Sequence, residues 1–182
     1  MDHMKQLKIL HTREIKRIIE IINKQWGCDL KKDLSGYVVL LSTKDKIYLL
    51  SRDFANVDDR NLNIDSAGMY FGEVLENNSM RLSIEGSQLV GPFAQKNAVE
   101  LDDDESRSWL AGNDIEKDTD AAGFVLLKNR NRETGRYDFL GCGKCRREGI
   151  GEGAGKNIGK KAMEKSRILN YVPKTRRISG QI

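Results

Sequence analysis

The apolar residues of this chain come in runs no longer than one β-strand, and the longest of them is Tyr37–Leu41. Segments rich in Gly, Asn and Asp, which favour turns, stand between these runs. This pattern predicts short strands joined by tight turns. No run approaches the roughly 20 apolar residues of a membrane-spanning helix. Charged residues interrupt the first apolar ones, unlike in a signal peptide. We therefore expect a cytoplasmic protein that does not associate with a membrane.

The first half of the chain contains one strong helix signal, over Thr12–Trp26. Isoleucines and Trp26 recur there at helical spacing. Thr12 suits the N-cap, and Gly27 suits a left-handed residue after the last turn. Strands are expected at residues 37–42, 46–51, 68–75 and 80–84. The pair Gly91-Pro92 is predicted to mark a domain boundary.

The sequence pattern of the second half predicts a compact β-barrel around one small helix. A strand is expected at Ala98–Leu101 and a short helix at residues 105–111, ended by Gly112. The four adjacent acids 102–105 suit the positive end of this helix. Four carboxylates in a row cannot all face one ion, so no metal site is expected there. Further strands are expected at residues 123–128, 137–144 and 168–172, with a hairpin loop at 129–136.

Charge is distributed unevenly along the second half. Residues 100–120 hold nine acids and two bases, a net charge of −7. Residues 128–177 hold fifteen bases and five acids, a net charge of +10. A basic segment of this density attracts polyanions such as nucleic acid. The alternative is the solvated surface of a charge-rich protein.

No residue pattern identifies a catalytic centre, and no cofactor is expected. Both histidines precede residue 12, and no activated serine or paired-carboxylate motif is present. Cys142 and Cys145 have CxxC spacing, but a structural zinc site usually needs two such pairs. We interpret them as ordinary strand cysteines. The alternatives are a zinc site and a small enzyme that uses Cys142 or Cys145. The glycine-rich segment 149–156 is not a P-loop, because Ile150 stands where that loop needs glycine. We predict a flexible loop whose lysines can meet phosphates.

Residues 167–177 combine strand-forming side chains with a cluster of cations. The apolar residues between 168 and 172 are expected to pair into a sheet, after which Lys174, Arg176 and Arg177 leave it. Tyr171 can stack on a base. The planar arginine guanidinium binds two phosphate oxygens at once. This stretch therefore predicts an RNA contact, and a disordered basic tail is the alternative.

From Ala98–Leu101 onward the chain resembles a PUA domain, a small RNA-binding pseudobarrel. The segment Trp109-Leu-Ala-Gly-Asn-Asp-Ile115 is similar to that family's helix and glycine turn. Residues 122–128 and 139–144 are similar to its paired strands. The resemblance implies that RNA lies in a groove beside the glycine-ended helix and the last strand. With the auxiliary lysines of the 146–166 insertion, the expected RNA-binding residues are Gly112, Asn113, Asp114, Lys144, Arg146, Lys160, Lys161, Arg167, Tyr171, Lys174, Arg176 and Arg177.

The first half is similar to the α/β domain that precedes PUA in a ribosome-biogenesis family. The similar segments are residues 37–51, 66–74, 80–84 and 89–94. The Nip-type members of that family bind pre-rRNA and other assembly factors. The same pairing of domains resembles accessory modules of the Sun-family RNA cytosine-5 methyltransferases. The 146–166 insertion is longer and more basic than the family pattern, and the Val-Pro-Lys-Thr-Arg-Arg ending looks more like the methyltransferase-linked modules.

These features predict an α+β chain with two domains. Residues 1–93 are expected to form a pre-PUA α/β domain with an antiparallel sheet, and residues 94–182 a PUA-like β-pseudobarrel. The expected function is non-catalytic binding of structured rRNA or tRNA, in ribosome biogenesis and rRNA processing or in RNA modification. The expected partners are that RNA and an RNA methyltransferase or ribosome-assembly factors. The alternative is a protein–protein adaptor in an RNA-processing assembly that uses the acidic and basic segments.

Overall fold

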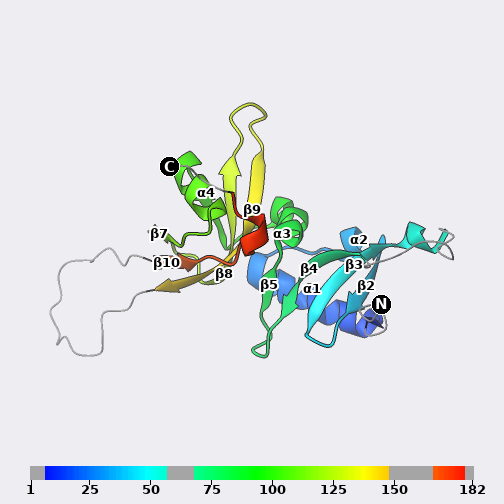
Figure 1. The fold of residues 1–182 in the computed structure, drawn as a ribbon. Helices are drawn as coiled ribbons and strands as arrows, with labels where there is room; N and C mark the ends of the chain where they lie inside the picture. The colour runs from blue at the N-terminus through cyan, green and yellow to red at the C-terminus, as the bar shows by residue number, and fades with distance from the viewer. Residues whose placement is uncertain (1–6, 57–67, 148–165, 179–182) are drawn as a thin grey trace, which may run out of the picture. The chain divides into compact units, whose positions relative to one another are not determined.

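The computed structural model describes residues 7–56, 68–147 and 166–178. Within them the chain forms helices and two five-stranded sheets, which confirms the α+β class (Figure 1). It divides into two compact units, residues 1–96 and 97–182. The pair Gly91-Pro92 belongs to a short 3₁₀ turn, η3 (Gly91–Phe93), near the end of the first unit. None of the described helices is long and apolar enough to cross a bilayer.

The first unit is an antiparallel sheet with a long helix on one face. The sheet order is β1 (Lys8–Ile9), β2 (Tyr37–Leu41), β3 (Lys46–Ser51), β4 (Met69–Val74) and β5 (Met80–Leu82). Helix α1 (Thr12–Trp26) runs along this sheet (Figure 1) and buries Ile18, Ile21, Ile22 and Trp26. Trp26 on the helix and Ile47 and Phe71 on the strands have no exposed surface. The apolar stripe of the helix therefore fills the core, as its spacing predicts.

Helix α1 has the predicted bounds, but its N-cap is His11 and not Thr12, which was expected to be the cap. The N-cap is His11, and its backbone N–H donates to Glu14 Oε2 at 3.0 Å. Glu14 thus satisfies a backbone donor at the start of the helix, as in a capping box. At the other end Gly27 has φ 72°, and its N–H donates to Asn23 O at 2.8 Å. The predicted left-handed residue is confirmed.

Two helices of the first unit were not expected from the sequence. The strand expected at residues 80–84 ends at Leu82, because Ser83 caps a helix, α3 (Ile84–Val90). The Ser83 hydroxyl accepts a hydrogen bond from Gly86 N at 2.9 Å, which stabilises the first turn. A second unpredicted helix is α2 (Lys31–Leu34). After β3 the chain forms a short 3₁₀ helix, η2 (Arg52–Asn56), and residues 57–67 lie outside the described part.

In its described residues, the second unit is a mixed sheet with one α-helix. Its strand order is β6 (Ala98–Leu101), β8 (Gly123–Arg130), β9 (Tyr137–Arg147), β10 (Ser166–Leu169) and β7 (Ile115–Lys117). β6 and β8 are parallel, and the other neighbours are antiparallel. Helix α4 (Asp103–Leu110) places Trp109 in the core, where Trp109, Val125 and Ile168 have no exposed surface.

The last strand is shorter than expected, and β7 was not expected at all. Residues 168–172 were predicted to be strand, yet β10 ends at Leu169. The backbone N–H groups of Asn170 and Val172 donate to side chains, Asp114 Oδ1 at 2.9 Å and Asn170 Oδ1 at 2.7 Å. Tyr171 and Val172 therefore lie outside the sheet. β10 pairs with β7 through Ile168 and Ile115, a non-local contact that no local pattern encodes.

Candidate nucleic-acid interface

Helix α4 is fixed at its start by the acidic run and at its end by a glycine. Asp102 is the N-cap and accepts a hydrogen bond from Glu105 N at 2.8 Å, while Glu105 Oε2 accepts from Asp102 N at 2.9 Å. Within the described residues no group of acids, cysteines or histidines could hold a metal ion. After the helix, Gly112 has φ 99°, a conformation that favours glycine. The turn that follows leads directly into β7.

Asn170 joins this turn to the last strand. Its Nδ2 donates to Trp109 O at 2.7 Å and to Asn113 O at 3.0 Å. Its backbone N–H donates to Asp114 Oδ1 at 2.9 Å, and its Oδ1 accepts from Val172 N at 2.7 Å. One side chain thus satisfies two carbonyls at the end of α4 and turns the chain away from the sheet.

Asp114 and Arg167 form an ion pair across the same junction. Arg167 Nε and an Nη donate to the same carboxylate oxygen, Asp114 Oδ2, at 3.0 and 2.7 Å. The Asn170 backbone N–H and this guanidinium hold the pKa of the Asp114 carboxyl below its usual value, against the effect of partial burial. Part of the Arg167 charge is therefore used to fix the turn. We infer that Asp114 is a positioning residue.

Arg177 packs against the glycine of the turn. A Cβ built on Gly112 would overlap the Arg177 side chain. Arg177 Nε donates to Val172 O at 3.1 Å, and Ile178 N donates to Leu110 O at 3.1 Å. The basic end of the chain is held against the α4–β7 turn by these contacts. The surface formed by residues 110–115 and 167–177 is called the tail surface below.

An aromatic pair and several cations adjoin the last strand. The rings of Phe124 and Tyr171 have centroids 6.2 Å apart, and Lys144 Nζ lies 5.6 Å from the centre of the Phe124 ring. Tyr171 keeps 36% of its surface exposed. Arg146 stands opposite Arg167 in the β9–β10 ladder, and both are exposed. On its other side Arg167 stands opposite Glu116 of β7, and it is paired with Asp114, so carboxylates of the chain itself offset its charge.

The structure thus brings most of the expected residues into one region of the second unit. Asp114 contacts Arg167, Gly112 contacts Arg177, and Asn113 is joined to the same junction through Asn170. Lys144, Arg146 and Tyr171 belong to the adjoining strand region, and Lys174 and Arg176 are exposed in the 3₁₀ turn η4 (Lys174–Arg176). Lys160 and Lys161 lie outside the described residues. Sequence reasoning missed Asn170 and Phe124. Asn170 lies inside the strand expected at residues 168–172, and its preference for turns was the only local signal against that strand.

The ion pair gives a pH prediction for the second unit. Because the pKa of Asp114 is lowered in the folded chain, its stabilising contribution is complete above the unfolded-state pKa of about 3.9 and is lost as the pH falls through the folded-state value. We expect the free energy of unfolding to drop as the pH falls below about 4, and Asp114→Asn to show a shallower drop. Urea unfolding at several pH values measures this. Equal pH slopes for both proteins would contradict it.

The three cysteines are buried. The exposed fraction is 4% for Cys28, 4% for Cys142 and 7% for Cys145. Burial raises the pKa of the Cys28 thiol to about 11. A reactive cysteine needs an exposed, electropositive setting that lowers its pKa. The burial of these three thiols does not provide such a setting. The cysteines are consistent with strand and core positions.

With this geometry established, the second unit can be assigned to a class. It contains a PUA domain, an RNA-binding module. Residues 96–150 match the family model described as the Methyltransferase RsmF PUA domain, which links the module to the Sun-family methyltransferases. The match covers less than a third of the chain. A search of curated proteins finds no match.

Proposed function

We propose that this chain is a non-catalytic, cytoplasmic RNA-binding protein that holds structured rRNA or tRNA against the tail surface for RNA modification. The observation that carries the proposal is the junction of the α4–β7 turn with the C-terminal segment. Asn170, Asp114 and Arg177 fix this junction, and Lys174 and Arg176 are exposed beside it. Preorganised cations beside an exposed tyrosine suit phosphate binding and base stacking together.

The partner that this function needs is an RNA methyltransferase. Support comes from the match of residues 96–150 to a methyltransferase-linked PUA domain. A role in ribosome biogenesis, with the assembly factors of Nip-type proteins, is the broader form of the same proposal, since large-subunit RNA is also a target for modification. In both forms the chain contributes recognition of RNA, and the chemistry is performed by another domain or protein.

The salt dependence of binding tests the proposal. Each phosphate contact steepens the plot of log affinity against log salt by about 0.7–0.9. We expect the double variant Lys174→Gln/Arg176→Gln to bind bulk tRNA or rRNA more weakly and to flatten this slope by up to about 1.8. Filter binding at a series of salt concentrations measures both quantities.

The matched control removes the same two positive charges elsewhere. Lys8 and Arg107 are exposed and paired with Glu14 and Asp104, each at 2.6 Å. The control Lys8→Gln/Arg107→Gln should leave the slope unchanged. Equal slopes for the wild type and both variants would contradict the proposal. Association that survives nuclease treatment and is insensitive to Lys174 and Arg176 would favour the adaptor alternative instead.

A further inference from the structure

The hairpin between β8 and β9 carries a second exposed basic region in the PUA unit. Its loop projects beyond the rest of the sheet (Figure 1). Along β9, Tyr137 at the hairpin end and Arg146 beside β10 are nine residues apart, which corresponds to roughly 30 Å of extended strand. The hairpin is therefore well separated from the tail surface, and a ligand atom cannot contact both.

Four side chains share one face of the hairpin, and one of them, Phe139, is buried. In the β8–β9 ladder Arg130 stands opposite Tyr137 and Lys128 opposite Phe139, so Lys128, Arg130 and Tyr137 point to the same side. Lys128 Nζ lies 3.7 Å from the centre of the Tyr137 ring. Tyr137 is 40% exposed, and its hydroxyl is hydrogen-bonded to Glu100. Lys128, Arg130 and Tyr137 are called the hairpin face below.

The loop that presents this face is ordered by its own hydrogen bonds. Asn131 Oδ1 accepts from the backbone N–H groups of Glu133 and Thr134, both at 3.0 Å, and Asn131 N donates to Arg136 O at 2.8 Å. Arg132 reaches back to Asp103 at 2.6 Å. Binding to a loop that is already fixed loses less conformational entropy than binding to one that must be ordered.

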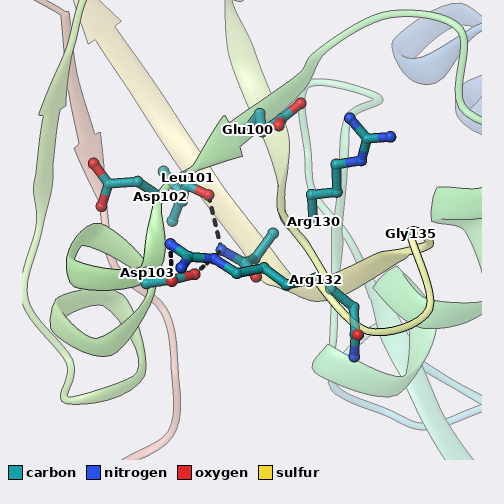
Figure 2. Close-up of a pocket in the computed structure, with 9 residues that line it drawn as sticks. Glu100, Leu101, Asp102, Asp103, Arg130, Arg132 and Gly135 are labelled. Atoms are coloured by element: carbon teal, nitrogen blue, oxygen red, sulfur yellow. Dashed lines mark hydrogen bonds and ion pairs between the residues drawn. The ribbon is translucent and has the colours of Figure 1, made fainter.

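A hollow of about 410 Å³ adjoins Arg130 (Figure 2). It exists because β6 ends at Leu101, opposite Asn129, while β8 continues to Arg130. Its lining mixes three carboxylates with two guanidinium groups, Glu100, Asp102, Asp103, Arg130 and Arg132. Carboxylates repel a phosphate from the interior, but they accept hydrogen bonds from the amino groups of a base. The lining therefore suits the edge of a nucleobase, with the phosphate outside.

Arg130 differs from its neighbour Arg132 in having no carboxylate partner. Arg132 is paired with Asp103, whereas Arg130 forms no ion pair with any residue of the described part of the chain. Figure 2 shows its guanidinium on the side of Glu100, away from the Asp103–Arg132 pair. Glu100 is engaged by the Tyr137 hydroxyl. An exposed guanidinium in this position is available to a phosphate.

We propose that the hairpin face binds an unpaired segment of the same RNA that occupies the tail surface. The Tyr137 ring stacks on a base, Arg130 and Lys128 hold its phosphates, and the hollow receives the edge of a neighbouring base. This inference rests on the proposed function and adds a requirement for a single-stranded segment about 30 Å from the RNA held by the tail surface.

The test compares two RNA probes with three proteins. The probes are a stem–loop RNA with an unpaired extension of about ten nucleotides, and the same stem–loop without it. The proteins are the wild type, Tyr137→Leu and Lys128→Gln/Arg130→Gln. Wild type should bind the extended probe on the order of tenfold more tightly. Each variant should lose that advantage and bind the short probe as the wild type does. Fluorescence anisotropy measures the affinities.

The controls separate stacking from other effects. Tyr137→Phe keeps the ring, so it should retain the preference for the extended probe even though the bond to Glu100 is lost. Lys8→Gln/Arg107→Gln should retain it as well. If wild type binds both probes equally, or if the variants keep the preference, the hairpin inference is overturned while the tail surface stands. If the wild type binds neither of the two probes and also fails to bind bulk tRNA and rRNA, the proposed function fails too.

Discussion

Asn170→Ala is expected to weaken RNA binding on the order of tenfold and to destabilise the second unit by about 2 kcal/mol. The substitution leaves the carbonyls of Trp109 and Asn113 and the N–H of Val172 without their partners. An unsatisfied, partly buried polar group costs about 1–3 kcal/mol. Once the α4–β7 turn is released from the last strand, the cations of the tail surface lose their fixed spacing. Urea unfolding and filter binding measure the two effects.

A matched variant distinguishes this role from a general loss of packing. Asn170→Asp keeps the shape of the side chain and the acceptor for Val172 N, but it cannot donate to two carbonyls and adds a charge beside Asp114. It should therefore be as deleterious as Asn170→Ala. If Asn170→Asp behaves like the wild type, the two carbonyl bonds do not hold the surface together.

Gly112→Ala is expected to reduce RNA affinity by a similar factor, on the order of tenfold. The new Cβ would overlap the Arg177 side chain, so the basic end of the chain must move away from the turn. The residue also has φ 99°, and a side chain in a left-handed conformation costs about 1–2 kcal/mol. RNA titration measures the loss of affinity, and thermal unfolding measures the loss of stability.

Gly123→Ala is the control for this substitution. Gly123 has φ 71°, and a Cβ there would meet nothing within 4 Å. The variant should lose stability through the backbone alone and keep its affinity for RNA. A Gly112→Ala protein that binds RNA as well as Gly123→Ala does would show that the contact between Arg177 and the turn is dispensable.

Local sequence patterns were sufficient to predict the elements whose apolar residues recur at a regular spacing. Helix α1 has the predicted bounds because isoleucines at helical spacing and a glycine after the last turn are both local signals. The hairpins of the first unit were placed because turn-forming residues separate their apolar runs. The sequence did not predict helix α3, because Ile84 continues the apolar pattern of β5. The signal for the helix is its N-cap, Ser83, whose hydroxyl accepts a hydrogen bond from Gly86 N.

The site was less predictable because its contacts join distant segments. The proximity of the 110–115 turn to the last strand came from the resemblance to a PUA domain. The residue that makes the junction, Asn170, bonds to carbonyls 61 and 57 positions away. Residues 170–172 read as strand because Tyr and Val favour strands, yet their backbone donors are taken by side chains. Strand propensity describes single residues. It does not account for side chains that bind the backbone donors in place of a neighbouring strand.

The position of β10 has a consequence for how the protein is made. Although β10 is the last strand of the described residues, it lies between β9 and β7 in the sheet. During synthesis, β7 therefore has no neighbour until residues 166–169 have left the ribosome, and the α4–β7 turn is not held by Asn170 before then. A nascent chain cannot assemble the tail surface early. The tail surface therefore forms only after residues 166–177 have been synthesised, about fifty residues after β7.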